Sequence, residues 1–253
     1  MNTSDELTEP LEAAAAILRA ARSVVVLTGA GISAESGVAT FRDAGGLWEG
    51  HRVTDVATPD AFRRDPAFVW RFYNARRDNL TRVSPNPGHL ALVAMEQRWK
   101  SAFAVVTQNV DNLHRVAGNE RIHELHGNLH RTRCTGCGVI ADRGLEPLGD
   151  APMCPECGHF LRPDIVWFNE ILPQDVWEAA LFAVHDCDCL IVVGTSAVVY
   201  PAAGLIPLAK RKTPPAKVIE VNLDPTLDND LIDVVLAGPS GVVLPRLMAM
   251  VDA

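Results

Sequence analysis

Four of the six cysteines in this 253-residue chain form two identical motifs, Cys134-x-x-Cys137 and Cys154-x-x-Cys157. Sixteen residues separate the motifs, which is the spacing of ribbons that hold a zinc ion between four thiolates. Because four protein ligands fill a tetrahedral shell, the sequence predicts a structural zinc that water does not reach. Such a ribbon can also contact nucleic acid or protein. Three arginines near the motifs leave that alternative open: Arg131, Arg133 and Arg143.

A second group of polar and glycine residues follows apolar runs at four places. These are Gly29-Ala30-Gly31 after SVVVLT (23–28), Gln108-Asn109-Val110-Asp111 after FAVVT (103–107), Gly194-Thr195-Ser196 after CLIVV (189–193) and Asn222 after KVIEV (217–221). Ligands of open α/β sheets bind beyond the carboxyl ends of the strands, so these four ends together predict a nucleotide site.

The first of these ends, GAGISAESG (29–37), is similar to a dinucleotide fingerprint. Its glycines would let the backbone approach a pyrophosphate, and the helix that follows would favour an anion at its N-terminus. A tight turn needs the same glycines without any ligand. The acidic residue that dehydrogenases carry about 20 residues later is replaced here by the loop-like stretch TFRDAGGLWEG (40–50). The sequence therefore predicts a nucleotide but not an ordinary hydride-transfer enzyme.

One histidine and one arginine stand out by their context. His126 lies in ELHGN (124–128), just before the cysteine segment, and is a candidate general base where two domains would meet. Arg76 falls on the apolar stripe of a helix predicted to begin after the cap residue Asp65, and Tyr73 precedes it by three positions. On spacing alone, an Arg76 side chain that extends to solvent or pairs with a carboxylate is the better explanation.

The elements that must position these residues alternate along the chain. The four apolar runs have the β-branched composition of strands buried on both faces, and helical patterns cover 11–23, 88–99, 174–186 and 201–211. This alternation predicts an α/β fold with a Rossmann-like, doubly wound parallel sheet. A smaller inserted domain would consist of a helical module (45–87) and a zinc ribbon (128–160). The larger, nucleotide-binding domain would then comprise residues 1–44, 88–127 and 161–253.

Composition narrows the class of protein. The chain is 48% hydrophobic and 21% charged, with a formal net charge of −8 and a pI of about 5.5, which argues against nucleic acid as the main partner. The first ten residues are acidic and lack an apolar run, and no stretch has the length of a membrane span. We therefore expect a cytoplasmic protein, a monomer, without a membrane or nucleic-acid partner.

Taken together, the motifs resemble the sirtuins, which are NAD-dependent protein lysine deacylases. The matching stretches are 29–48, 107–114, 125–128, the two cysteine motifs, 162–170, 194–196 and 221–225, in the same order and spacing. The resemblance implies NAD as a consumed co-substrate, a structural zinc, and acylated lysine in proteins or peptides as the second substrate. The products would be free lysine, nicotinamide and an O-acyl-ADP-ribose.

The resemblance also implies roles for individual residues. His126 would be the general base that accepts a proton from a ribose hydroxyl. The segment Val166, Trp167, Phe168 and Asn169 would pair as a strand with the acyl-lysine peptide. The residues that would contact NAD are Gly29, Ala30, Gly31, Glu35, Thr40, Phe41, Arg42, Trp48, Gln108, Asn109, Val110, Asp111, Gly194, Thr195, Ser196, Asn222, Asp224 and Ser240.

Within this family a Tyr-x-x-Arg pair is associated with a preference for succinyl, malonyl and glutaryl lysine, and Tyr73 and Arg76 match it. A guanidinium can bind a terminal carboxylate bidentately and a phenol adds a hydrogen bond, while the small Ala57 would leave room for a longer acyl chain. We expect retained activity on acetyl-lysine. A plain deacetylase, an ADP-ribosyltransferase and a non-catalytic NAD-binding or zinc-ribbon interaction module stay open as alternatives.

Three residues depart from the family pattern. Ala39 replaces a usual proline and predicts a looser cofactor loop. Asp43 replaces a small residue and would bring a negative charge near the cofactor. Asn169 replaces a glycine, and because asparagine tolerates positive φ better than most residues, we expect the substrate segment to keep its conformation.

Overall fold

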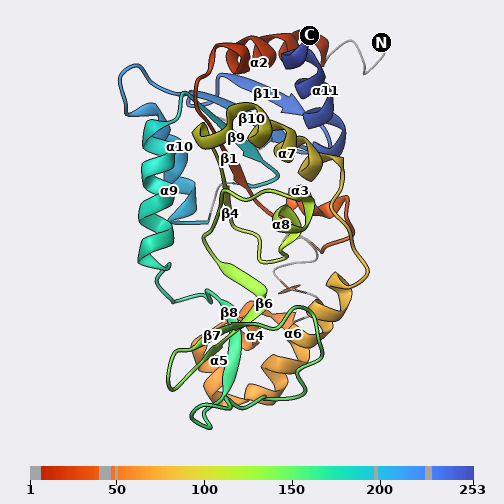
Figure 1. Ribbon diagram of the computed structural model, residues 1–253, viewed down its shortest axis with the longest axis vertical. Coiled ribbons are helices and arrows are strands. Elements are labelled where there is room, and N and C mark those ends of the chain that lie inside the picture. The colour runs from red at the N-terminus through yellow and green to blue at the C-terminus, as the bar shows by residue number, and fades with distance from the viewer. Residues whose placement is uncertain (1–6, 40–46, 49–50, 197–198, 226–229) are drawn as a thin grey trace.

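The computed structural model describes residues 7–39, 47–48, 51–196, 199–225 and 230–253 (Figure 1). Its centre is a parallel sheet with the strand order β11-β10-β9-β1-β4-β5. The strands are β1 (Val24–Thr28), β4 (Phe103–Thr107), β5 (Ile122–Glu124), β9 (Cys189–Val193), β10 (Lys217–Asn222) and β11 (Val234–Ala237). The four predicted strands are confirmed, and β5 and β11 extend the sheet at its edges.

Helices cover both faces of this sheet, as the doubly wound prediction requires (Figure 1). Helices α2 (Thr8–Ala20), α7 (Pro87–Trp99) and α11 (Ser240–Asp252) share a buried core with Val24 and Val26, whereas α9 (Gln174–Asp186) and α10 (Leu205–Lys210) share one with Val25 and Leu27. Successive strand residues point to opposite faces, so each face needs its own apolar residues. That is why the central strands β1, β4 and β9 are almost continuous apolar runs.

A second cluster of elements lies below the sheet in Figure 1 and has its own apolar core. It contains helices α4 (Val53–Val56), α5 (Pro59–Arg64) and α6 (Pro66–Leu80), and an antiparallel sheet of β7 (Ile140–Asp142), β6 (Gly127–Cys134) and β8 (Leu161–Ile165). Helix α6 begins as predicted, because Asp65 Oδ1 accepts a hydrogen bond of 2.9 Å from the Phe68 amide. The remaining short elements are α3 (Gly31–Ala34), β2 (Leu47–Trp48), β3 (His51–Arg52) and α8 (Leu113–Ala117).

Two details differ from the sequence analysis. The predicted helix at 201–211 consists of a 3₁₀ turn, η2 (Ala202–Gly204), followed by α10. Strand β8, which the sequence analysis assigned to the larger domain, pairs with β6 along Cys134 to Leu161 and Gly127 to Ile165. The apolar residues of β8 therefore serve the smaller sheet, and the domain bounds stay a prediction. In the part of the chain that the structure describes, no helix is both long and apolar enough to cross a membrane.

Candidate active site

The ends of β1 and β9 touch each other through backbone alone. The Gly29 amide donates to the Val193 carbonyl at 3.0 Å, and the Gly31 amide donates to the Gly194 carbonyl at 2.8 Å. A Cβ atom at Gly31 would lie 2.7 Å from the Gly194 Cα atom, and Gly194 itself has a φ of +59°. The close contact between the two strand ends alone therefore requires glycine at these positions. A ligand at this edge would be a second, separate reason for them.

The helix after the first strand end is shorter than the fingerprint predicts. Helix α3 contains only residues Gly31–Ala34. Because one turn carries little of the dipole of a full helix, the predicted attraction of an anion to a helix N-terminus is not supported here.

Amide side chains tie the strand ends into one polar edge. Gln108 Nε2 donates to Thr195 Oγ1 at 3.1 Å, Asn109 Nδ2 donates to the Gly29 carbonyl at 3.1 Å, and Asn222 Nδ2 donates to the Thr195 carbonyl at 3.2 Å. These bonds link β1, β4, β9 and β10 at the switch in strand order, where ligands of doubly wound sheets bind.

Asp111 is held below this edge by groups that the sequence analysis did not identify. Its carboxylate is buried and accepts from Ser33 Oγ at 2.7 Å and from the Leu113 amide at 2.9 Å. Burial raises the pKa of Asp111, although both hydrogen bonds lower it. Ser33 Oγ also lies 3.5 Å from His89 Nε2, and His89 Nδ1 accepts a hydrogen bond from the backbone N–H of Asn86 at 3.3 Å. The His89 proton is therefore on Nε2, facing Ser33.

A second buried histidine lies against the first. The rings of His89 and His114 have centroids 5.0 Å apart, and His114 Nε2 is 2.9 Å from Thr28 Oγ1, which itself donates to Thr107 Oγ1. Burial lowers the pKa of His89 to about 4 and that of His114 to about 3. Both rings are neutral at pH 7. In the sequence, the one sign of these two buried histidines is a polar residue among apolar ones. That pattern is common in protein cores and does not by itself indicate a functional site.

His126 follows β5 and is bonded by its Nδ1 to the Gln108 carbonyl at 3.0 Å. A carbonyl oxygen only accepts, so Nδ1 carries the proton and Nε2 keeps its lone pair. Burial lowers the pKa of His126, and the hydrogen bond to Gln108 partly opposes this. The imidazole is therefore neutral near pH 7 and able to accept a proton at Nε2.

The strand ends, Asp111 and His126 line one cavity of about 620 Å³. Every described residue that the sequence analysis assigned to the cofactor also lines it: Gly29, Ala30, Gly31, Glu35, Gln108, Asn109, Val110, Asp111, Gly194, Thr195, Ser196, Asn222, Asp224 and Ser240. Thr40, Phe41, Arg42 and Asp43 lie outside the described residues, as does the side chain of Trp48 in β2. The binding roles of the whole set stay predictions.

Glu35 has a structural partner beside the cavity. Its Oε2 accepts from the Gly241 amide at 2.7 Å and from Ser240 Oγ at 3.2 Å, which are the first residues of α11. A carboxylate at a helix N-terminus is stabilised by the unpaired amides there. Glu35 therefore joins the segment after β1 to α11. This structural role is separate from the predicted role of Glu35 in NAD binding.

Tyr73 and Arg76 form part of the cavity wall on the side of α6. Tyr73 is fully buried, and its Oη accepts from Trp167 Nε1 at 3.0 Å. Burial raises the pKa of Tyr73, so the phenol keeps its hydrogen and can donate it. Arg76 is only 8% exposed, and its guanidinium carbon lies 5.9 Å from the Phe72 ring centroid. Extension of Arg76 to solvent is therefore wrong, whereas pairing with a carboxylate stays open as the alternative and the acyl specificity stays a prediction.

The predicted substrate segment leaves β8 as a loop along the same cavity. The Val166 amide donates to the His126 carbonyl at 2.9 Å, and the Phe168 amide donates to the Ala57 carbonyl at 3.0 Å. Asn169 has a φ of +70°. The expectation that asparagine replaces glycine by accepting this conformation is confirmed, and pairing with a peptide stays a prediction.

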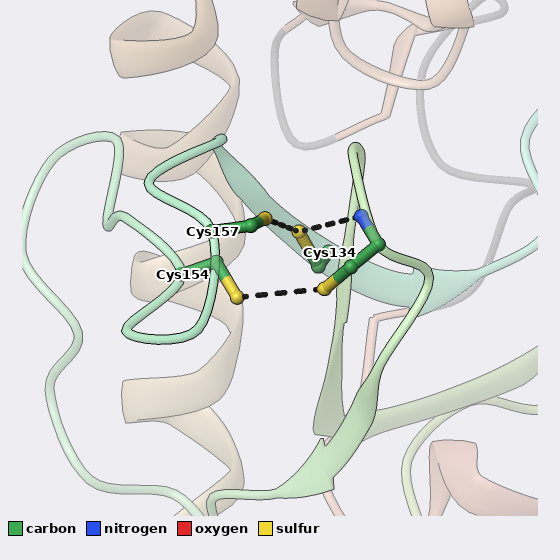
Figure 2. A group of neighbouring side chains, drawn as sticks. Cys134, Cys154 and Cys157 are labelled. Carbon is green, nitrogen blue, oxygen red and sulfur yellow. Dashed lines mark hydrogen bonds between the residues drawn. The ribbon is translucent and has the colours of Figure 1, made fainter.

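The four cysteines of the two motifs come together at one end of the three-stranded sheet (Figure 2). Their sulfur atoms all lie within 4.8 Å of one another, with Cys134 and Cys157 3.3 Å apart and Cys137 and Cys154 3.8 Å apart. Zinc–sulfur bonds of about 2.3 Å in a tetrahedron put sulfur atoms about 3.8 Å apart. The cluster therefore fits a four-thiolate zinc site.

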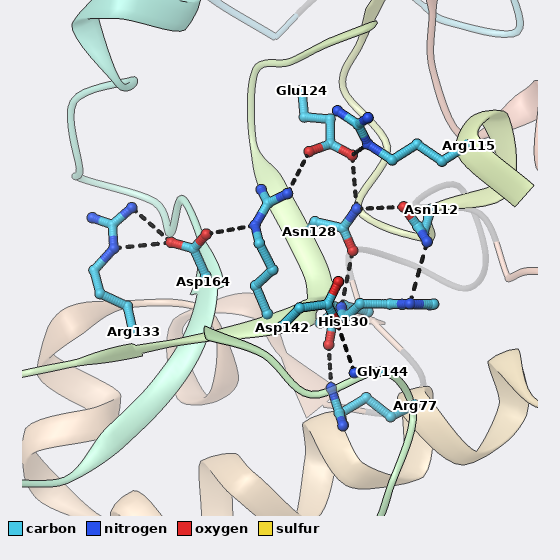
Figure 3. A network of polar contacts seen from close by, with 12 residues as sticks. Arg77, Asn112, Arg115, Glu124, Asn128, His130, Arg133, Asp142, Gly144 and Asp164 are labelled. Carbon is cyan, nitrogen blue, oxygen red and sulfur yellow. Dashed lines mark hydrogen bonds and ion pairs between the residues drawn. The ribbon is translucent and has the colours of Figure 1, made fainter. Parts of the chain in front are cut away.

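Ion pairs engage two of the arginines near the ribbon (Figure 3). Arg131 Nε lies 3.0 Å from Asp164 Oδ2 and its Nη1 lies 2.8 Å from Glu124 Oε2, while Arg133 Nη2 lies 2.7 Å from Asp164 Oδ1. The carboxylates are buried. Arg131 thus links the smaller sheet to β5 of the larger one, whereas Arg133 pairs within the smaller sheet. The alternative of a ribbon that contacts nucleic acid stays open.

Comparison with known proteins agrees with this geometry. A model described as the Sir2 family matches residues 29–201, which is more than half of the chain. The chain belongs to the Sir2 family. NAD-dependent protein deacylase 2 of Pyrobaculum aerophilum is 48% identical over 234 residues, covering 92% of this chain and 92% of that protein.

Solved Sir2 structures share the fold. The crystal structure of a Sir2 homologue in complex with NAD is 39% identical, with a TM-score of 0.87 over 95% of this chain and 93% of that one. The structure of Sir2Af2 bound to a myristoylated histone peptide is 34% identical, with a TM-score of 0.77 over 96% of this chain and 97% of that one. The family and the Rossmann-like fold predicted from the sequence are confirmed.

Proposed function

We propose that this Sir2 protein is an NAD-dependent protein lysine deacylase that prefers acyl groups ending in a carboxylate. The observation that carries the proposal is the single cavity that His126 shares with the strand ends and with Tyr73 and Arg76. A base, a nucleotide-binding edge and a cationic wall in one cavity are the parts that this reaction needs. Relatives named NAD-dependent protein deacylases support the same reaction class.

The strand ends would hold NAD, and the residues present fit it. The Gly31–Gly194 contact brings bare backbone to the cavity, which suits a phosphate group. Gln108, Asn109 and Asn222 line the same edge with both donors and acceptors, which suit ribose hydroxyls and an amide. When bound, NAD supplies an activated ribose that accepts the acyl group as nicotinamide departs.

His126 would act as the general base on a ribose hydroxyl. Its neutral ring accepts a proton at Nε2 while Nδ1–H stays bonded to the Gln108 carbonyl. The cation that forms keeps that hydrogen bond, which becomes charge-assisted and stronger. Gln108 therefore orients the base and stabilises its protonated form.

Arg76 and Tyr73 would select the acyl group. A succinyl or malonyl group ends in a carboxylate, which a guanidinium binds with two parallel hydrogen bonds and which the Tyr73 hydroxyl can also reach as a donor. A neutral acetyl group offers neither interaction, so it would bind less tightly but still react. Ala57, which is buried in the cavity wall, leaves the space that a longer chain needs.

The four cysteines would hold a structural zinc. Among the described residues that line the cavity, none is a cysteine, so this zinc would stabilise the ribbon and take no part in acyl transfer. The engagement of Arg131 and Arg133 with Asp164 supports a protein without a nucleic-acid partner. A monomer and a cytoplasmic location stay predictions.

The test is nicotinamide release from NAD with one peptide that carries succinyl-lysine, acetyl-lysine or unmodified lysine. We expect release only with the acylated peptides, a higher kcat/KM for the succinyl peptide, and loss of release in His126→Tyr. Retained turnover in His126→Tyr would refute the assigned base. Release that does not depend on acylation would favour ADP-ribosyl transfer. An acetyl preference in the unmodified enzyme would keep the deacylase and remove the acidic-acyl specificity.

A further inference from the structure

Helix α6 carries two adjacent buried arginines that point in different directions. Arg76 is 8% exposed and lines the cavity, whereas Arg77 is 2% exposed and does not. At 3.6 residues per turn, neighbouring side chains lie about 100° apart around a helix axis. The mechanism uses only the first arginine, so the second calls for its own explanation.

Arg77 reaches from α6 to the ribbon and its flanking strand (Figure 3). Its Nη1 donates to the Leu129 carbonyl in β6, and its Nη2 donates to the Glu146 carbonyl at 2.9 Å, between the two cysteine motifs. Backbone carbonyls within a folded sheet and loop cannot turn away as a side chain can. Two such acceptors on one rigid, planar guanidinium fix the helix in direction as well as distance.

Two more residues on the same side of α6 make equivalent bonds. Trp70 Nε1 donates to the Leu161 carbonyl at 2.7 Å, and Asn74 Nδ2 donates to the Gly149 carbonyl at 2.8 Å. Residues 70, 74 and 77 follow the four- and three-residue spacing of one helix face. All three donate from side chains to backbone carbonyls of the segment that carries the cysteines, and together they set the rotation of α6.

We propose that Arg77 is a positioning residue for acyl selection. Together with Trp70 and Asn74 it fixes the rotation of α6 about its axis, and this rotation sets where Tyr73 and Arg76 lie in the cavity. This inference rests on the proposed role of Tyr73 and Arg76 in binding an acidic acyl group. A rotation of about 10° moves a group about 6 Å from the helix axis by about 1 Å. A misplacement of that size can cost about 10²-fold in a reaction that depends on fixed geometry. The ribbon thus acts on specificity through α6.

The test compares Arg77→Met with Arg76→Met and with Arg71→Met. Arg71 is the matched control because it lies on the same helix and binds the ribbon residue Asp150 at 3.1 Å, but as an exposed pair, which contributes little. Steady-state kinetics with succinyl and acetyl peptides give kcat and KM for each protein. We expect Arg77→Met to lower the succinyl-to-acetyl ratio of kcat/KM by about tenfold, mainly through the KM of the succinyl peptide. Arg77→Lys keeps a charged donor and should restore part of the ratio, and Arg71→Met should match the unmodified enzyme.

The outcomes separate this inference from the proposed function. If Arg76→Met leaves the ratio unchanged, the acidic-acyl proposal fails and the role of Arg77 fails with it. If Arg76→Met lowers the ratio and Arg77→Met does not, only the positioning role is wrong. A purely structural role for Arg77 would lower kcat for both peptides in proportion and leave the ratio intact, which also refutes the inference. If Arg77→Met does not fold, the half-buried Asn74→Ala replaces it, with an expected fall of about threefold and the same refuting result.

Discussion

Two buried histidines under the cavity should make this fold sensitive to mild acid. His89 is 0% exposed and His114 is 3% exposed, and burial lowers the pKa of His89 to about 4 and of His114 to about 3. Protonating either ring in the folded protein would place a charge where water cannot solvate it. The informative change is His114→Gln, which keeps an N–H that can donate to Thr28 but removes the titrating ring.

The size of the effect follows from proton linkage. An unfolded histidine has a pKa of about 6.5, so below that pH the unfolded chain binds protons that the folded protein refuses, and stability falls as the pH falls toward the folded-state pKa. Between pH 7 and pH 5 each buried histidine costs about 2 kcal/mol of unfolding free energy. Both folded-state pKa values lie below 5, so this figure depends little on their exact position. The His114→Gln protein should therefore lose about 2 kcal/mol less than the unmodified protein over this interval.

The assay is urea unfolding followed by tryptophan fluorescence at pH 7 and pH 5. Zinc affinity also changes with pH and affects both proteins alike. The quantity to compare is therefore the loss of unfolding free energy between pH 7 and pH 5 in His114→Gln and in the unmodified protein. His185→Gln is the matched control, because that side chain is 63% exposed, and it should lose as much as the unmodified protein. An equal loss in His114→Gln and the unmodified protein would refute the claim that His114 is buried and neutral.

Three further predictions concern the cavity and the ribbon. Because burial lowers the pKa of His126, kcat/KM for an acyl peptide should rise with pH, with its inflection below the ordinary histidine value of about 6.5; an inflection above pH 7 would contradict a neutral His126 base. Gly31→Ala places a Cβ 2.7 Å from the Gly194 Cα, so the KM for NAD should rise by about tenfold or more, and an unchanged KM would mean that the strand ends separate freely. Cys154→Ser removes a buried sulfur of the cluster and should lower both the zinc content, measured by elemental analysis, and the thermal midpoint, by about 10 °C; a variant that keeps both would exclude a structural zinc.

The central strands could be predicted because both of their faces are buried. Every residue of β1, β4 and β9 is buried, so each strand is an almost continuous apolar run, which propensity and pattern both favour. The edge strands β5 and β11 escaped prediction because they are short and only partly buried. Their conformation depends on pairing with β4 and β10, which no local pattern in the sequence encodes.

The candidate site divides along a similar line. Residues that follow a strand could be found, because the end of an apolar run is visible in the sequence and the fold brings such ends together. Ser33 and His89 could not, because their importance lies in a hydrogen-bond chain to Asp111 that only the packed structure assembles. The conformation of Asn169 could be anticipated because the family resemblance puts a glycine at this position, and the φ of +70° is one that asparagine accepts.

Arg76 and Arg77 illustrate why position alone does not assign a role. Burying a guanidinium costs several kcal/mol unless other groups replace its water. For Arg77, two backbone carbonyls replace that water, and the gain is a helix fixed against the ribbon. Arg76 lies in the wall of the cavity, where its charge can act on a bound group. The same helix thus needs one arginine to hold it and one to act, and the acyl specificity that we propose depends on both.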